Sequence, residues 1–507
     1  MARARRFSSV QPTGTEYIQS WDKLAVSDII TRAISNRTSL INGTSIRAKA
    51  TRSVMALAAG TAIERSLRFA RYVILARILA PDQFGLMALV MSASSALEAL
   101  TEVGVKQSVI QNKRGADPEY LNVAWWFQAV RGLGLFAIAF LAAPWISSFY
   151  QKPELLWLLR VAFLAILFRG FVSPRAHVLE KQYRFGMVVF LLQGSGIVGA
   201  VIAIVLAFVI RNVWALVIGF VCEYAIMCVL SYVFVPFVPR FRLDRACLRE
   251  LTEFARGMFG VPILTMIAFE TDVLVLGKMV TGGEVGMYYL AMTLVLLPIT
   301  LYGRMIHPVL LPAFSEKQDD REALRRVILR VTRTMAIFTL PLVAFMASSA
   351  GGILALAYTS RYTAVTAPFA LLCLLIVCRI EAPVLNSAYL AVGQPRLNRR
   401  LVVLRAAIIG GLIYPAIVHF GLLGAAVVVV LGNGIGLLMQ VFWSRRIVDL
   451  KFAAYARCYL PGLVLALPIV AMNLLRFSGI ESPFIVLGLN TAAFCGSWVA
   501  GALFLLK

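Results

Sequence analysis

Four ionisable side chains fall within one apolar stretch near the start of the chain, at Glu64, Arg65, Arg68 and Arg71. At 100° per residue, Glu64, Arg68 and Arg71 lie within about 60° of one another on a helix, forming one polar stripe with net positive charge. A charge in hydrocarbon is costly, so the stripe must face a cavity or a partner helix. In a purely structural alternative, Glu64 pairs with Arg68 while Arg65 and Arg71 extend to lipid headgroups.

Three more arginines, at Arg131, Arg169 and Arg304, are each bracketed by apolar residues in later stretches. Arg131 is flanked by Gly132 and Gly134, which would allow another helix to approach closely. Each arginine is a candidate for lining a cavity, and Arg169 and Arg304 could instead extend to the membrane surface.

Acidic residues inside apolar stretches are candidates for binding a coupling ion, H+ or Na+. Glu98 and Glu102, four residues apart, share one helix face, and Glu270 and Asp272 lie together in a later stretch. Glu223 and Glu381 each lie in a further apolar stretch. The structural alternative is that such carboxylates neutralise neighbouring arginines.

Arg379 and Glu381 illustrate that alternative, because their closeness in sequence predicts an ion pair between them. The seven cysteines are scattered without the spacing of a metal site or a disulfide framework. The cysteine pattern therefore predicts no metal site. We also expect no catalytic residues and no bound cofactor.

The elements that must position these residues are membrane-spanning helices. The 507 residues are 60% hydrophobic and only 15% charged, whereas a soluble domain is roughly 25% charged. Uncharged runs exceed the ~20 residues that a helix needs to cross a bilayer. The sequence predicts an all-α polytopic membrane protein with about 14 transmembrane helices. The predicted spans are 54–79, 84–109, 121–147, 154–178, 186–210, 212–236, 254–278, 285–313, 334–358, 364–392, 401–420, 422–444, 458–475 and 482–506.

The basic residues predict the topology. Of the 49 Lys and Arg residues, 35 fall in the N-terminal tail and in every second connection, and only 6 in the intervening connections. Positive charge marks the cytoplasmic side, so both termini are expected there. The net charge of +24 is thereby explained, and no nucleic-acid partner is predicted.

An internal repeat organises the spans. LARILAPDQFGLM at 75–87 and LGKMVTGGEVGMY at 276–288 match at an offset of 201 residues. Parallel repeats of this kind are typical of transporters that hold substrate between two halves. We expect a disordered cytosolic tail over 1–50, an N-lobe of six spans over 51–239, a C-lobe of six spans over 240–447 and two further spans over 448–507.

Short motifs in a fixed order carry a family resemblance. They are the LARILAPDQFGLMALV run with the E-x-G-x-x-x-x-x-I-Q stretch at Glu102–Gln111, Trp125-Trp126, VWAL at 213–216, the turn at 271–286, LLPAFSEKQDD at 310–320 and GQPRLN at 393–398. Together with the fourteen spans, they resemble the Wzx-like polysaccharide flippases of the multidrug/oligosaccharidyl-lipid/polysaccharide exporter superfamily.

The resemblance implies a V-shaped, two-lobed bundle in the bacterial inner membrane. Such proteins flip undecaprenyl-pyrophosphate-linked oligosaccharide repeat units by alternating access, for exopolysaccharide or lipopolysaccharide biosynthesis. It also implies that the arginines within the spans bind the pyrophosphate, which a guanidinium can hold through two hydrogen bonds. A polysaccharide polymerase and a chain-length regulator are potential partners.

Two other functions remain open at this stage. One is a cation-coupled exporter of drugs or other small molecules on the same superfamily fold. The other is a membrane enzyme, a polymerase or ligase, acting on the same lipid-linked sugars. No predicted outer connection exceeds about ten residues and no GxxxxGK[ST] phosphate loop is present. The sequence therefore favours a transporter over an enzyme.

Overall fold

The computed structural model describes residues 64, 66–101, 104–182, 185–240, 244–258, 260–474 and 483–506. All regular elements in these residues are helical, which confirms the all-α fold. The predicted tail over 1–50 lies outside the described residues. Besides a helix within 66–78, the elements are α5 (Pro81–Thr101), α6 (Val105–Gln111), α7 (Pro118–Tyr150), α8 (Leu155–Ala162), α9 (Leu164–Gly170), α10 (Arg175–Lys181), α11 (Phe185–Ile210), α12 (Trp214–Phe234), α13 (Arg245–Met258), α14 (Val261–Met279), α15 (Gly282–Ser315), α16 (Arg321–Ser348), α17 (Ala350–Ala357), η1 (Ser360–Val365), α18 (Thr366–Leu372), α19 (Leu374–Ala391), α20 (Pro395–Val448), α21 (Phe452–Arg457), α22 (Leu460–Leu474) and α23 (Pro483–Leu506).

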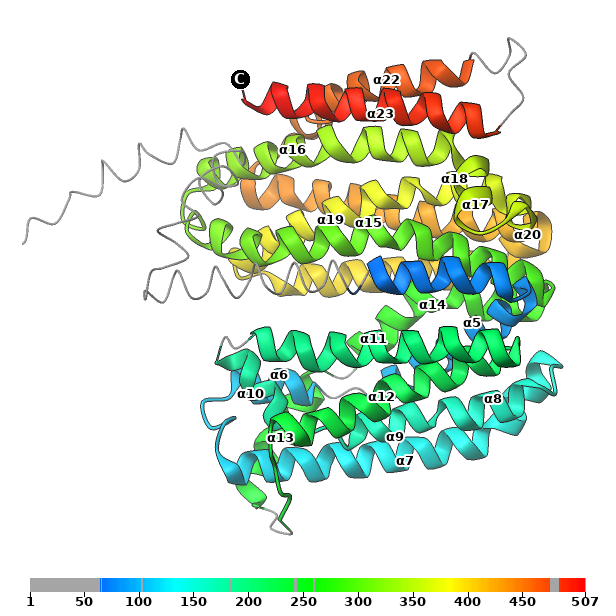
Figure 1. Ribbon diagram of the computed structural model, residues 1–507. Helices are drawn as coiled ribbons and strands as arrows, with labels where there is room; N and C mark the ends of the chain where they lie inside the picture. The colour runs from blue at the N-terminus through cyan, green and yellow to red at the C-terminus, as the bar shows by residue number, and fades with distance from the viewer. Residues whose placement is uncertain are drawn as a thin grey trace, which may run out of the picture.

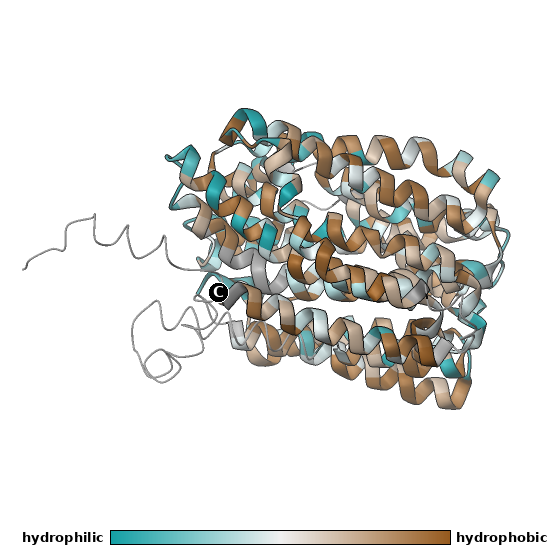
Figure 2. Ribbon diagram, turned by 90° about the horizontal axis from the view of Figure 1, so that it is seen from above, coloured by the Kyte–Doolittle hydropathy of each residue, from teal (hydrophilic) through white to brown (hydrophobic). Residues whose placement is uncertain are grey.

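The outer surface of the helices is apolar. Large side chains such as Trp145 and Val209 are 74% and 76% exposed, and hydrophobic colour runs along the helices while hydrophilic residues gather toward their ends (Figure 2). Among the described residues, eight helices are long and apolar enough to cross a membrane, or ten when each of two bent pairs counts as one span. The chain is a multi-pass membrane protein, and helices lie in all fourteen predicted ranges.

Two predicted spans, 401–420 and 422–444, are joined without a loop in α20. The backbone leaves the helical conformation only at Gly421, with φ 54° and ψ −135°. A Cβ atom on Gly424 would lie 2.0 Å from the carbonyl oxygen of Ala416. Eight residues of straight helix would separate these positions by about 12 Å, so the chain turns sharply at Gly421.

The helices form two bundles (Figure 1). The first contains α7, α8, α9, α11 and α12. The second contains α14, α15, α16, α19 and α20, and α22 and α23 pack against its α16. Helix α5 lies between the bundles and packs most extensively against α14 and α15.

The two copies of the sequence repeat touch each other where the bundles meet. A Cβ atom on Gly85 would lie 2.0 Å from the carbonyl oxygen of Gly282, and one on Gly286 would lie 1.9 Å from that of Pro81. With the repeat offset of 201, Pro81 corresponds to Gly282 and Gly85 to Gly286. The same contact is therefore made twice with the partners exchanged, as at a twofold axis.

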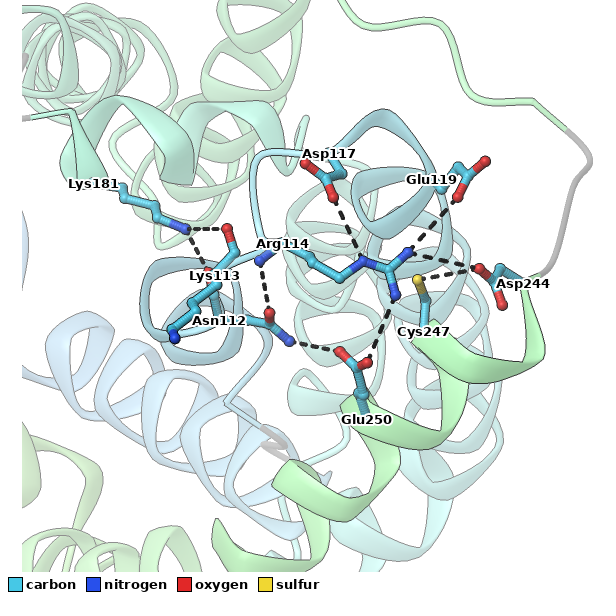
Figure 3. Close-up of polar contacts among 9 residues, drawn as sticks. All are labelled: Asn112, Lys113, Arg114, Asp117, Glu119, Lys181, Asp244, Cys247 and Glu250. Atoms are coloured by element: carbon cyan, nitrogen blue, oxygen red, sulfur yellow. Dashed lines mark hydrogen bonds and ion pairs between the residues drawn. The ribbon is translucent and has the colours of Figure 1, made fainter.

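At one end of the bundles, charged side chains hold α13 against the first bundle. Arg114, in the turn after α6, reaches four carboxylates at 3.5–4.0 Å (Figure 3). Its partners are Asp117, Glu119, Asp244 and Glu250. Each pair is exposed and weak by itself, but the network joins α13 to the turn before α7. Gly260, with φ 88°, then allows the chain to bend by 44° into α14.

Connections that the charge pattern places on the same side contact one another. Arg325 lies 3.5 Å from Asp449, and both positions belong to connections rich in basic residues. At the opposite end, the side-chain oxygen of Gln83 accepts a 2.7 Å hydrogen bond from the backbone N–H of Val213. The first contact joins two basic connections, and the second lies between two connections that are poor in Lys and Arg.

Candidate functional site

Arg68 is held between two glutamates inside the membrane region. Its Nε donates to Glu64 Oε1 at 2.7 Å and its Nη2 donates to Glu223 Oε1 on α12 at 2.9 Å. The glutamate side chains are only 8% and 10% exposed. Gly196 of α11 leaves room for this cluster, since a Cβ there would lie 3.1 Å from Arg68 Nη2. Arg68 thus pairs with Glu64, as the purely structural alternative predicts, and also with Glu223 on a helix distant in sequence.

Arg71 is the buried cation next to this cluster. It is 8% exposed, and its guanidinium lies 4.8 Å from the centre of the Tyr72 ring. Its Nε has no hydrogen-bond partner, and it forms no ion pair with the described residues. The Tyr72 hydroxyl lies 3.2 Å from that of Tyr289 on α15, so this contact joins the helix within 66–78 to the second bundle. Arg71 can therefore offer its charge to an anion at the boundary between the bundles.

A second group of candidates surrounds a cavity of about 310 Å³ in the first bundle. Arg169 of α9 forms an ion pair with Glu98 of α5, and its guanidinium lies 5.4 Å from the Tyr224 ring. Arg131 of α7 donates to the Glu98 carbonyl oxygen at 3.3 Å. Lys106 and Glu180 also line the cavity and pair with each other at 2.8 Å. The walls that the described residues form therefore carry three Lys or Arg and two Glu side chains.

Glycines bring the helices of this cavity together. A Cβ on Gly132 would lie 2.7 Å from the Cα of Gly170, so α7 and α9 touch backbone to backbone beside Arg131. This is the close approach that the sequence predicts for Gly132. Gly134 has no atom within 4 Å of its Cβ position and so plays no part in it.

The acidic candidates of α14 face different neighbours. Glu270 accepts a 2.7 Å hydrogen bond from Ser92 on α5, at the boundary between the bundles. Asp272 is 4% exposed and accepts a 3.0 Å hydrogen bond from the hydroxyl of Tyr288 inside the second bundle. The two carboxylates are therefore hydrogen-bonded to different helices, although both lie near enough to the guanidinium of Arg379 on α19 to interact with its charge.

The expected pairing of Arg379 with Glu381 is not formed. Side chains two positions apart on a helix point in directions about 200° apart, so Arg379 and Glu381 lie on opposite faces of α19. The Arg379 guanidinium lies instead 4.3 Å from the centre of the Phe269 ring on α14. Glu381 Oε1 has no hydrogen-bond partner among the described residues.

Three candidates cannot be placed. Arg65 and Glu102 lie outside the described residues, and only the backbone of Arg304 is described, within α15.

The sequence does not predict the surroundings of two charged residues. Glu223 lies 155 residues from Arg68, and no local spacing indicates their contact. Arg405 belongs to a predicted cytoplasmic connection, yet its side chain is packed against the second half of α20. Its Nε lies 2.6 Å from the position that a Cβ on Gly436 would take. Its Nε and Nη2 have no hydrogen-bond partner among the described residues. The small residues of the LGNGIG run are the signal that space is left there for a long side chain.

Comparison with known proteins places this geometry in context. The family model described as "Polysaccharide biosynthesis protein" matches residues 74–367. The lipopolysaccharide biosynthesis protein WzxC of Escherichia coli is 22% identical over 390 residues, covering 76% of this chain and 78% of that protein. The succinoglycan biosynthesis transport protein ExoT of Rhizobium meliloti is 24% identical over 278 residues, covering 54% of this chain and 56% of that protein.

Solved structures share the fold. The lipid II flippase MurJ in an inward closed conformation superposes with a TM-score of 0.73 at 14% identity, over 89% of this chain and 100% of that one. An inward-facing multidrug transporter of the MATE family superposes with a TM-score of 0.63 at 16% identity, over 76% of this chain and 94% of that one. At these identities the likeness is one of fold.

Proposed function

The chain belongs to the polysaccharide biosynthesis protein family, and on that basis we propose that it flips undecaprenyl-pyrophosphate-linked oligosaccharide repeat units across the bacterial inner membrane. It works by alternating access, as a transporter without catalytic activity, for exopolysaccharide or lipopolysaccharide biosynthesis. Both termini are cytoplasmic. A polysaccharide polymerase and a chain-length regulator act next to it on the outer side.

The observation that carries the proposal is the family match combined with the symmetric joint between the two repeats. The joint lies at the end of the bundles opposite the Arg114 network, at Gly85 and Gly286. At these two glycines the backbones of α5 and α15 touch directly, with no Cβ atom between them. Opening this joint while the other end closes would carry a substrate from one side to the other.

The arrangement of charge suits a lipid-linked pyrophosphate. Arg71 is a buried cation without an ion pair among the described residues, at the boundary between the bundles. We assign it the pyrophosphate. Arg68 is available only when Glu64 and Glu223 release it, so it contributes in a different conformation.

The remaining candidates contact other parts of the substrate or bind the coupling ion. Arg131 and Arg169 contact polar groups of the substrate in the cavity of the first bundle, and Arg65 and Arg304 extend the basic surface along the same route. The coupling ion, H+ or Na+, binds at one of the carboxylates Glu98, Glu102, Glu270 and Asp272.

Deletion of the gene tests the proposal. We expect undecaprenyl-linked repeat units to accumulate on the cytoplasmic leaflet and secreted polymer to disappear, with both restored by the wild-type gene. Single repeats that reach the outer leaflet but stay unpolymerised would indicate an enzyme instead. Unchanged pools of both would point to a drug exporter and overturn the proposal.

A further inference from the structure

A carboxylate is buried where the second bundle meets the C-terminal helices. Glu381, in the middle of α19, is 1% exposed. Its Oε2 accepts a long hydrogen bond of 3.4 Å from the hydroxyl of Tyr455 on α21. The hydroxyl of Thr332 on α16 is fully buried beside the carboxylate. Neither Glu381 Oε1 nor Thr332 Oγ1 has a hydrogen-bond partner among the described residues.

No described positive charge balances this carboxylate. Arg379 on the same helix lies over Phe269, and Arg333 on α16 lies over the ring of Phe504. The titratable groups that face Glu381 from the adjoining elements are phenols and thiols. They are Tyr455 of α21, Tyr459 and Cys458 just after it, and Cys378 of α19.

An ionised carboxylate in this place would be buried with only the hydroxyls of Tyr455 and Thr332 as donors and with no described positive charge beside it, which is costly. A proton on Oε1 removes the charge and also provides an O–H donor, for which the unused Thr332 hydroxyl is an acceptor. Tyr455 continues to donate to Oε2. The neutral acid therefore satisfies groups on three helices at once.

We propose that Glu381 is a proton-binding site that fastens α21 to the second bundle, with the proton shared between Glu381 and Thr332. This site goes beyond the proposed function, which gives Glu381 no role.

The position of α21 gives the site a consequence. This short helix leads directly into α22, which packs along α16. Its flanking residues Lys451 and Arg457 are exposed and belong to a connection rich in basic residues. The partner helix α21 of Glu381 therefore lies at the side that the charge pattern assigns to the cytoplasm. Loss of the proton places a charge in the joint and loosens the C-terminal helices from the lobe.

Infrared difference spectroscopy of the full-length protein in lipid vesicles tests the site. We expect the wild type at pH 7 to show the C=O stretch of a neutral, hydrogen-bonded carboxylic acid, and Glu381→Gln to lose the intensity of one such group. Glu322→Gln is the matched control, because Glu322 lies exposed at the start of α16. It should remove only an ionised carboxylate signal.

Two further results decide the proposal if Glu381→Gln folds poorly. Thr332→Val should move the carboxylic acid band to higher frequency, because its hydrogen bond is lost, and Tyr455→Phe should move it as well. A Glu381 signal that is ionised at pH 7 would overturn the proposal. A neutral acid band that appears only when Na+ is withdrawn would also overturn it, in favour of a sodium site.

Discussion

Replacing Arg68 by alanine should destabilise the protein through the two glutamates that it leaves behind. Arg68 bridges Glu64 and Glu223 at 2.7 and 2.9 Å, and both carboxylates are at most 10% exposed. Breaking a buried ion pair from one side costs roughly 3–5 kcal/mol. Because the Arg68 side chain is itself 28% exposed, we expect the lower end, about 3 kcal/mol, or about a hundredfold in the folded-to-unfolded ratio.

A double-mutant cycle isolates this effect. Adding Glu223→Gln to the Arg68→Ala protein removes one uncompensated charge, so the double variant should be more stable than Arg68→Ala alone, with a coupling energy above about 1 kcal/mol. Equilibrium unfolding in mixed detergent micelles, followed by tryptophan fluorescence, measures all four proteins.

Arg325→Ala provides the matched control for this cycle. Arg325 lies 3.7 Å from Glu322 and 3.5 Å from Asp449, whose carboxylates are 66% and 70% exposed. Surface pairs contribute roughly 0–1 kcal/mol, so its loss should be small. If Arg68→Ala costs no more than Arg325→Ala and Glu223→Gln brings no recovery, the cluster does not stabilise the fold and the reasoning is refuted.

Three other perturbations have expected outcomes. Gly286→Ala must separate α5 from α15 by at least 1.1 Å, the difference between the 3.0 Å lower limit for a Cβ contact and the 1.9 Å present. This overpacking, of roughly 1–3 kcal/mol, should lengthen the distances between spin labels on the two helices. Gly303→Ala has open space around its Cβ position and should leave those distances unchanged. Asp320→Asn should weaken the start of α16, because the carboxylate accepts hydrogen bonds from the N–H groups of Glu322 and Ala323 at 2.9 and 3.0 Å. The Ala323 N–H bond lowers the pKa of Asp320, so its stabilisation is complete above the ordinary aspartate pKa and disappears as the pH falls through the lowered value; melting curves of wild type and variant should converge in acid, and a constant difference would contradict this. Arg131→Ala should lower polymer export roughly tenfold, equivalent to about 1.4 kcal/mol, at unchanged amounts of folded protein, whereas normal export would remove Arg131 from the substrate route.

The helices themselves are predictable because the membrane leaves the backbone no alternative. Every N–H and C=O group in hydrocarbon must find a partner within its own helix, so an apolar run of sufficient length forms a helix whatever surrounds it. The turn at Gly421 is equally local, since a positive φ favours glycine. The repeat motif also carries tertiary information, because its glycines Gly85 and Gly286 lie at the contact between α5 and α15.

Partners at the candidate site are less predictable. Glu64 with Arg68 follows from helical spacing, but Glu223 joins them through the packing of α12, which no local pattern specifies. Arg379 and Glu381 are the opposite case, because the sequence predicts an ion pair between them that the structure does not form. Neighbours in sequence point to different sides of a helix, so one lies against α14 and the other against α16 and α21. Contacts of this kind depend on tertiary packing alone.

The most direct test of the central claim is transport by the purified protein in vesicles. Undecaprenyl-pyrophosphate-linked repeat units are placed in both leaflets, and a sugar-modifying reagent that cannot cross the bilayer is added outside. Vesicles with the protein should lose the protected inner-leaflet fraction, whereas protein-free vesicles and vesicles with Arg71→Gln should retain it. A fraction that stays protected in the presence of folded wild-type protein, under an imposed H+ or Na+ gradient, would contradict the account.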